Sequence, residues 1–441
     1  MSISHGGEFA TRRVSPGAGP TTAIRAEHIY KIFGRRPAEL VRRLEAGEPP
    51  EDLKELGTAA VIDATFDVAA GEIFVVMGLS GSGKSTLIRT LNGLWKPTSG
   101  SVLIGDTDLA AVSDKRLREI RRTSVSMVFQ HFALLPHRTV RENAAYGLKE
   151  QGLPKAERLE RADHWLDVVG LRGWGDRYPS QLSGGMQQRV GLARALATET
   201  PILLMDEAFS ALDPLIRREM QDQLVELQSD LGKTIVFITH DLNEAMYVGD
   251  RIAVMRSGRI VQIGTAEQIL TDPANDYVAK FISEVDRTRV LTAGTVMEPA
   301  AAVVPITAGP RGAINEMRAK QTSGVLVTER GRLRGYVTDA DAVAAVKADV
   351  PDLAPLIRTE SMVRVSESTP VAELFAPSAQ SPVPLVVTDD DGRLRGVVPR
   401  VGLLAALAPP PDTTTTEPTA QAPTRDADTL QSDDERGEEN P

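Results

Sequence analysis

Residues 78–86 constrain the fold of this chain more than any other stretch. They read GLSGSGKST, which fits the pattern G-x-x-x-x-G-K-[ST] of a loop that wraps phosphate groups. In such a loop, glycines let backbone N–H groups turn inward, the lysine reaches the β- and γ-phosphates, and the next hydroxyl ligates Mg²⁺. Residues 72–77 predict a buried strand before the loop, and residues 85–91 predict a helix whose N-terminus faces the phosphates. The candidate phosphate and metal ligands are Gly78, Ser80, Gly81, Gly83, Lys84, Ser85 and Thr86.

Polar residues end three further apolar runs, and each run predicts a buried strand. These are Gln130 after residues 124–129, Asp206 and Glu207 at the end of residues 202–207, and His240 after residues 234–239. Ligands of open α/β sheets collect at the carboxyl ends of strands, so we expect all four side chains near the same phosphates. Asp206 is suited to hold Mg²⁺ through water, and Glu207 to accept a proton from an attacking water. His240 can sense the γ-phosphate, and Gln130 can reach a metal or a water.

Residues 182–188, LSGGMQQ, lead into an Ala- and Leu-rich run at 190–197 that predicts a helix. Ser183 is well placed as its N-cap, and the two glycines behind it leave the helix N-terminus open to an anion. Taken alone, the segment fits a plain capping turn equally well. Its position directly before the strand with the paired carboxylates favours the anion-binding interpretation.

Composition narrows the class of protein. The 441 residues suffice for about three domains, and 41% hydrophobic content is ample for folded cores. The absence of cysteine excludes disulfides and thiolate metal sites and fits a reducing compartment. The net charge of -10 argues against nucleic acid as a partner. No run approaches about 18 apolar residues, so we expect no transmembrane segment, and residues 1–22 are interpreted as a flexible leader rather than a signal peptide.

The remaining parts of the first domain are predicted from patterning. Alternation at 23–30 predicts an edge strand, and Phe33 is a candidate to lie over an adenine ring, although an ordinary core aromatic explains it equally well. The charged segment 34–58 predicts a short helical insertion on the surface. Residues 131–198 are expected to form a largely helical subdomain.

Taken in chain order, the motifs resemble the nucleotide-binding subunit of an ABC transporter: the phosphate loop, Gln130, residues 182–188, Asp206 with Glu207, Asp213 and His240. The detailed sequence of three segments resembles, more narrowly, the ATPase subunit of glycine betaine/L-proline (quaternary amine) importers. These segments are IFG at 32–34, VFQ at 128–130 with FAL at 132–134, and DEAFSALDPLIR at 206–217. The similarity covers roughly residues 24–286 closely. It implies a P-loop ABC-type ATPase domain at 23–286, with a mixed sheet and a helical subdomain.

The resemblance also implies residue roles and partners. ATP and Mg²⁺ would be the cofactors, with Phe33 stacked on adenine, Asp206, Ser85 and Gln130 at the metal, Glu207 as general base and His240 on the γ-phosphate. Gln130 would also couple the site to the membrane partner. The residues of the LSGG segment that would bind the nucleotide held by a second copy are Ser183, Gly184, Gly185 and Gln187. Asp213 would lie at the seam between copies. Further implied partners are an integral membrane permease and, indirectly, an extracytoplasmic solute-binding protein. The chain would therefore work at the cytoplasmic face of the cell membrane.

The last folded part of the chain is a tandem repeat. GRLRGYV at 331–337 and GRLRGVV at 392–398 match at an offset of 61 residues. Residues 291–408 resemble a pair of CBS units, an α+β domain that often binds adenine nucleotides. The first unit keeps the family's polar pair, Thr338 and Asp341, whereas the second has Pro399 and Gly402 there. At most one adenine-nucleotide site is expected, and a purely structural or dimerising role fits equally well.

Several alternatives stay open at this stage. The acidic, Pro- and Thr-rich tail at 409–441 predicts disorder, with a solubilising role favoured over a regulatory one. The leading hypothesis for function is an ATPase that powers import of a compatible solute. A soluble ABC ATPase of translation or DNA repair, an importer of a different small solute, and a regulatory adenylate-binding module with a vestigial ATPase are the alternatives. A single phosphate loop argues against the soluble types, and intact Glu207 and His240 argue against the vestigial one.

Overall fold

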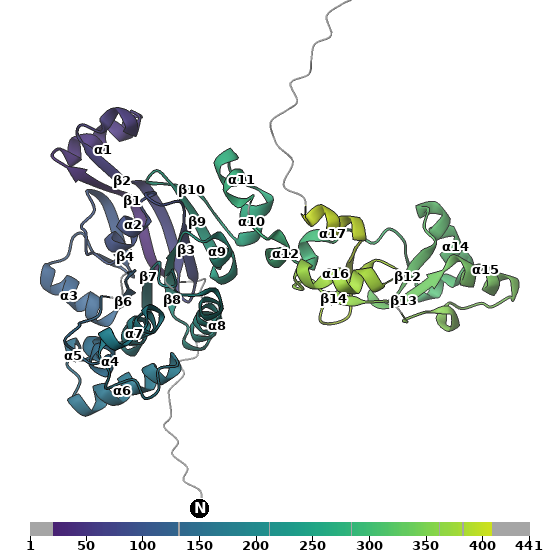
Figure 1. Ribbon diagram of the computed structural model, residues 1–441. Coiled ribbons are helices and arrows are strands. Elements are labelled where there is room, and N and C mark those ends of the chain that lie inside the picture. The colour runs from purple at the N-terminus through teal and green to yellow at the C-terminus, as the bar shows by residue number, and fades with distance from the viewer. Residues whose placement is uncertain are drawn as a thin grey trace, which may run out of the picture. The chain divides into compact units, whose positions relative to one another are not determined.

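The computed structural model describes residues 21–407, except positions 131, 132, 211, 284, 361 and 382 (Figure 1). The predictions for the acidic tail and for nearly all of the leader therefore lie outside the described residues. Thr22 already belongs to the first strand, so regular structure begins inside the segment predicted as leader. No helix in the described part of the chain is long and apolar enough to cross a membrane.

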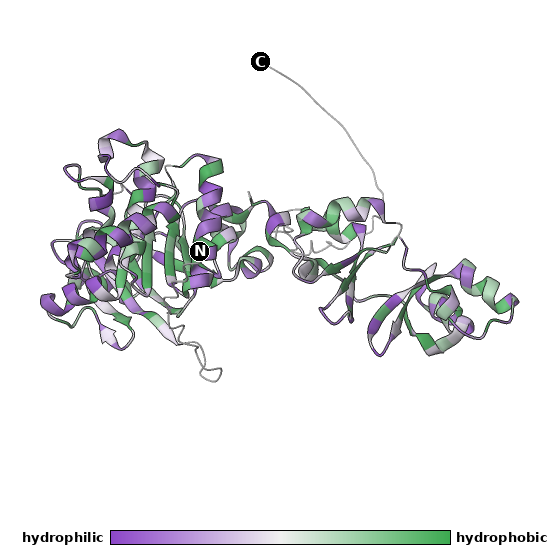
Figure 2. Cartoon of the chain, turned by 90° about the horizontal axis from the view of Figure 1, so that it is seen from below, coloured by the Kyte–Doolittle hydropathy of each residue, from purple (hydrophilic) through white to green (hydrophobic). Residues whose placement is uncertain are grey.

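A six-stranded sheet carries the predicted strand ends, in the order β10-β9-β3-β8-β7-β6. Its strands are β3 (Ile73–Met77), β6 (Val125–Val128), β7 (Ile202–Asp206), β8 (Thr234–Thr239), β9 (Arg251–Arg256) and β10 (Arg259–Gly264). All neighbours are parallel except β10, which runs antiparallel to β9. Every residue of β3, β7 and β8 is buried, as expected for parallel strands covered on both faces. Figure 2 shows these strands as mostly hydrophobic. The four strands predicted from apolar runs are confirmed to within a residue or two.

A second sheet has the order β2-β1-β4-β5. It consists of β1 (Thr22–Gly34), β2 (Gly57–Ala69), β4 (Ser99–Ile104) and β5 (Thr107–Asp108). The prediction of an edge strand at 23–30 is wrong, because β1 pairs with β2 on one side and with β4 on the other. The alternation correctly marks Ile24 and Ala26 as buried, and a register shift between Ala26 and Ile29 then brings Ile29 and Tyr30 into the core as well. Alternation reports which face of a strand is buried, and it carries no information about how many neighbours the strand has.

The segment between β1 and β2 contains α1 (Pro37–Glu45) and the short 3₁₀ helix η1 (Pro50–Leu53). Leu40, Val41 and Leu44 of α1 pack on apolar residues of β1 and β2. The insertion leaves and re-enters the sheet at Gly34 and Gly57, which pair in register. A Cβ atom on Gly57 would lie 2.5 Å from the carbonyl oxygen of Phe33, so only glycine fits there.

Helices cover the six-stranded sheet. The phosphate loop runs into α2 (Lys84–Leu91), and the other sheet-associated helices are α3 (Asp114–Thr123), α8 (Pro214–Leu231), α9 (Leu242–Val248), α10 (Ala266–Thr271) and α11 (Asp276–Ile282). The region predicted to be helical contains α4 (Val140–Ala144), α5 (Tyr146–Glu150), α6 (Lys155–Val168), η2 (Pro179–Gln181) and α7 (Gly184–Ala197). Helix α7 begins at Gly184, as expected from Ser183 as its N-cap, because the Ser183 hydroxyl accepts from the Met186 N–H (3.3 Å).

The repeat predicted from sequence is confirmed by two small sheets of identical topology, β11-β12-β13 and β14-β15-β16. The first unit holds β11 (Val303–Pro305), α14 (Gly309–Lys320), β12 (Gly324–Glu329), β13 (Arg332–Thr338) and α15 (Asp339–Lys347). The second holds β14 (Arg364–Ser366), α16 (Val371–Gln380), β15 (Leu385–Thr388), β16 (Leu394–Val398) and α17 (Arg400–Leu407). The short helices α12 (Arg287–Val290) and α13 (Ala293–Val296) precede them. The units exchange segments, since Arg358 pairs with Tyr336 of β13 and Glu298 pairs with Val397 of β16.

Candidate active site

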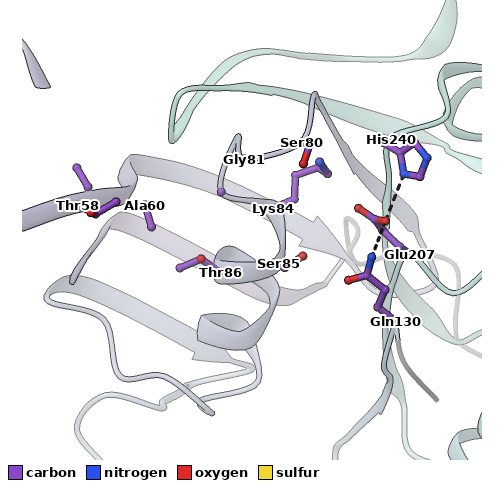
Figure 3. A pocket seen from close by; sticks show the side chains of 12 residues that line it. Thr58, Ala60, Ser80, Gly81, Lys84, Ser85, Thr86, Gln130, Glu207 and His240 are labelled. Atoms are coloured by element: carbon purple, nitrogen blue, oxygen red, sulfur yellow. Dashed lines mark hydrogen bonds and ion pairs between the residues drawn. The ribbon is translucent and has the colours of Figure 1, made fainter. Parts of the chain in front are cut away.

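The phosphate loop and three strand ends enclose a pocket of about 510 Å³. Figure 3 shows the loop and the start of α2 on one side, and Gln130, Glu207 and His240 on the other. The lining residues are Thr58, Ala59, Ala60, Ser80, Gly81, Gly83, Lys84, Ser85, Thr86, Gln130, Glu207 and His240. Nine of these twelve were predicted from sequence, which leaves Thr58, Ala59 and Ala60 of β2 as the lining residues that sequence reasoning missed.

Glycines are required where the phosphate loop turns. Gly83 has a φ of 102°, and a Cβ atom there would lie 2.1 Å from the carbonyl oxygen of Ala60. Gly78 has a φ of 154°, and its Cβ would lie 2.2 Å from the carbonyl oxygen of Met255. The loop is thus pressed against the backbones of β2 and β9, and α2 starts immediately after Gly83. The first-turn N–H groups of α2 have no partner within the helix, so they are available to phosphate oxygens.

Lys84 lies inside the curve of the loop. Only 4% of the residue is exposed, and its ammonium donates to the carbonyl oxygens of Gly78 (2.7 Å) and Leu79 (3.0 Å). Burial lowers the pKa of Lys84, while the nearby carboxylates of Glu207 and Asp206 act in the opposite direction. A buried cation at the base of an open pocket is suited to bind an anion.

The three predicted catalytic side chains are in contact. The Gln130 side-chain amide donates to Glu207 Oε2 (3.0 Å), and His240 Nδ1 lies 3.3 Å from the same oxygen. They follow β6, β7 and β8, which are neighbours in the sheet, and this adjacency brings them together. Glu207 itself adopts a φ of 47°, which is uncommon for a residue other than glycine. Its N–H donates to the Ile238 carbonyl (3.0 Å), which fixes the strained turn that points the carboxylate at the pocket.

Asp206 sits beneath the phosphate loop and is fully buried. Its Oδ1 accepts from the Ser85 hydroxyl (2.9 Å), whereas its Oδ2 has no hydrogen-bond partner among the described residues. The Arg89 guanidinium, which sequence reasoning also missed, lies 3.7 Å from Oδ2. Burial raises the pKa of Asp206, opposed by its bond to Ser85 and by the charge of Arg89. A carboxylate oxygen without a hydrogen bond, close to a hydroxyl, fits Mg²⁺, which takes few protein ligands and keeps water and phosphate in the rest of its shell.

Phe33 does not line the pocket. Its ring is 39% exposed and contacts Trp95 edge-on, with 5.1 Å between the ring centroids. Its register partner across the sheet is Thr58, which does line the pocket. Phe33 thus stands beside the rim formed by β2, and the alternative of an ordinary core aromatic does not hold for so exposed a ring.

The LSGG segment lies apart from this pocket. Among the described residues that line the pocket, none comes from 182–188, and Asp213 is not one of them. Ser183 and Gly184 are exposed at the start of α7, and a Cβ on Gly184 would meet open space. The Gln187 amide donates back to the carbonyl oxygens of Pro179 (3.1 Å) and Leu182 (3.3 Å). Asp213 is the N-cap of α8, where its side chain accepts from the Ile216 N–H. In the single chain, the phosphate-loop pocket and the LSGG segment are therefore two separate surfaces.

The polar pair of the first repeat unit is already engaged. Thr338 caps α15 by accepting from the Asp341 N–H (3.2 Å), and its hydroxyl donates to the Asp341 carboxylate (2.6 Å). Arg358, from the segment that leads into the second unit, forms an ion pair with that carboxylate at 2.7 Å. Hydrogen bonding by Arg358 lowers the pKa of Asp341.

This fold and this pocket define a class of protein. Residues 61–210 match the family model described as ABC transporter, and residues 293–348 match the model described as CBS domain. The chain is an ATP-binding subunit of an ABC transporter and consists of an ATPase domain followed by a CBS domain. It hydrolyses ATP to energise solute uptake.

Similar proteins narrow the class. The glycine betaine/carnitine transport ATP-binding protein GbuA of Listeria monocytogenes is 50% identical over 87% of this chain and 97% of its own length. The glycine betaine transport ATP-binding protein OpuAA of Bacillus subtilis is 49% identical over 87% of this chain and 92% of its own. The glycine betaine/proline betaine transport system ATP-binding protein ProV of Escherichia coli is 45% identical over 87% of this chain and 97% of its own length. This chain belongs to the family of these transport ATP-binding proteins.

Proposed function

We propose that this ATPase powers uptake of glycine betaine or a related quaternary amine, such as proline betaine or carnitine. The single observation that supports this proposal is the similarity to betaine transport ATP-binding proteins over 87% of the chain, repeat domain included. An importer of a different small solute is the second candidate. It is favoured by 49% identity over 62% of the chain to the trimethylamine N-oxide transport ATP-binding protein TmoW of Ruegeria pomeroyi.

In the proposed reaction, the phosphate loop holds the triphosphate of ATP, with Lys84 on the β- and γ-phosphates. Glu207 takes a proton from the attacking water, while Gln130 and His240 orient its carboxylate and His240 also contacts the γ-phosphate. When bound, Mg²⁺ would be held by Ser85, Asp206 and Gln130, and it would neutralise phosphate charge. Catalysis of this kind rests on positioning and charge stabilisation.

The separation of the two phosphate-binding surfaces supports a shared site. In the proposed assembly, the LSGG segment of one copy closes over the ATP held by the phosphate loop of another. Ser183, Gly184, Gly185 and Gln187 would contact that nucleotide, and Asp213 would lie at the seam. The exposed, uncrowded start of α7 leaves room for this approach. A membrane permease would use the closure, and an extracytoplasmic binding protein would deliver the solute. The chain would then work at the cytoplasmic face of the membrane.

For the repeat domain we propose one adenine-nucleotide site at most, in the first unit. Thr338 and Asp341 would contact the ligand, and Arg358 would have to release Asp341 first. A ligand-free structural role is the alternative, and the Asp341–Arg358 ion pair, which ties the two units together, favours it.

Uptake assays test the proposed solute. A strain lacking this chain is expected to accumulate labelled glycine betaine at least tenfold more slowly than the parent, and a plasmid copy should restore uptake. The Glu207→Gln variant is the matched control, because it should be expressed and still fail to restore uptake. Normal betaine uptake in the deleted strain, with loss of trimethylamine N-oxide uptake instead, would favour the second candidate.

A further inference from the structure

A small polar cavity lies directly behind the catalytic pair. It has a volume of about 20 Å³ and is bounded by Glu207 and His240 on one side. Arg217 of α8 and residues at the start of α9 bound it on the other side. A cavity of this size holds one water molecule when polar groups line it.

Arg217, which lines this cavity, has one N–H donor without a hydrogen-bond partner among the described residues. Its Nη2 donates to the carbonyl oxygen of Leu212 (3.2 Å), and its Nη1 lies 3.3 Å from Asp241 Oδ2. Its Nε is buried and has no hydrogen-bond partner among the described residues. Buried N–H groups are almost always hydrogen-bonded, so this donor points to a ligand in the cavity.

The rest of the wall determines which ligand fits. Three acidic residues line the cavity, Glu207, Asp241 and Glu244, and the basic residues that line it are Arg217 and His240. Glu244 is only 6% exposed, and its carboxylate accepts from Gln221 (3.1 Å) and from the hydroxyl of Thr239. The ligand must accept from Arg217 and donate to carboxylates. A water molecule does both, whereas an anion would be repelled by the carboxylates and a metal ion would not accept from Arg217.

We propose that one ordered water molecule fills this cavity and that Arg217, as a positioning residue, uses it to hold Glu207 in its working orientation. The inference rests on the proposed role of Glu207. Arg217 also holds the Leu212 carbonyl, and Leu212 immediately precedes Asp213, the residue proposed to lie at the seam between copies. The water and Arg217 thus link the turn that meets a second copy to the general base. Closure of the dimer would in this way be transmitted to the orientation of the catalytic carboxylate.

Substitutions of Arg217 test the link by kinetics. Arg217→Met is expected to lower kcat for ATP about tenfold and to change KM less than twofold, because ATP does not contact Arg217. Arg217→Lys should remain equally slow, since lysine restores the charge near Asp241 without restoring the Nε donor. Arg218→Met is the matched control, because Arg218 is on the same helix, points at Asp222 and Tyr247, and lies outside the cavity. The Arg218→Met variant should have a kcat within twofold of the wild-type value.

Two kinetic results would overturn the inference. One is a kcat for Arg217→Met equal to that of Arg218→Met; the other is full recovery in Arg217→Lys, which would mean that charge alone matters. A crystal structure of the wild-type protein at high resolution tests the water without any variant. It should show a water within about 3 Å of Arg217 Nε, and an empty or collapsed cavity would refute the proposal. If Glu207→Gln is inactive and either of these two Arg217 results is observed, this inference is wrong and the proposed function still stands.

Discussion

The Glu207→Gln variant is expected to bind ATP as the wild type does and to hydrolyse it roughly 10²- to 10⁴-fold more slowly. Glutamine keeps the size of the side chain and its contacts with Gln130 and His240, but it cannot take a proton from the attacking water. Phosphate release at saturating ATP, together with binding of a fluorescent ATP analogue, would measure both quantities. Because hydrolysis is blocked after ATP has bound, the variant should also accumulate as an ATP-bound dimer.

The exposed Glu226 of α8 offers a control with the same chemistry. Glu226→Gln should hydrolyse ATP at the wild-type rate within twofold, since it lies outside the pocket. Hydrolysis in Glu207→Gln that stays within threefold of the wild type would remove Glu207 from the role of general base. A loss of ATP binding in that variant would instead indicate that the pocket itself had been damaged.

The second large effect is expected for Lys84→Met. Hydrogen bonds to a charged partner contribute about 1.5–3 kcal/mol, so ATP affinity should fall by roughly 10- to 100-fold. Hydrolysis should fall further, by about 10²–10³-fold, because the ammonium also stabilises charge on the transferring phosphoryl group. Titration with ATP, followed by steady-state hydrolysis at saturating ATP, separates the two losses.

Lys233 provides a matched buried lysine for this experiment. It is 8% exposed, burial lowers its pKa, and its ammonium donates to the Thr200 carbonyl (2.6 Å), at the opposite end of β8 from His240. Lys233→Met is expected to lower the free energy of unfolding by about 1–3 kcal/mol and to leave the KM for ATP unchanged. Equal losses of ATP binding in both variants would show that the effect of Lys84→Met comes from damage to the fold.

The contact among Gln130, Glu207 and His240 could be predicted from sequence because it depends on a simple geometric rule. Gln130, Glu207 and His240 each end an apolar run, and parallel strands bring their carboxyl ends to one edge of a sheet. The phosphate loop was predictable for a different reason, since its glycines are required by local backbone conformation. In both cases the determining information lies within a few consecutive residues.

The features that sequence reasoning missed depend on pairing between distant segments. Thr58 and its neighbours line the pocket because β2 pairs with β1 across the helical insertion, and alternation alone did not reveal the neighbours of β1. Arg89 approaches Asp206 only because α2 packs against the end of β7. The Asp341–Arg358 ion pair requires the two repeat units to exchange segments, which no local pattern signals.

In the proposed assembly, a working ATP site contains the phosphate loop of one copy and the LSGG segment of another. Cross-linking tests it directly, because the chain has no cysteine of its own. Ser80 and Ser183 are both exposed, one in the phosphate loop and one at the start of α7. Chains carrying Ser80→Cys and chains carrying Ser183→Cys, each combined with Glu207→Gln, would be mixed with ATP under mild oxidation.

We predict a covalent dimer that forms in the mixture and requires ATP. Neither variant should form that dimer alone, since a head-to-tail arrangement sets Ser80 opposite Ser183 rather than opposite itself. Absence of a cross-link in the mixture, or an equal yield of dimer from Ser80→Cys alone, would contradict the shared site.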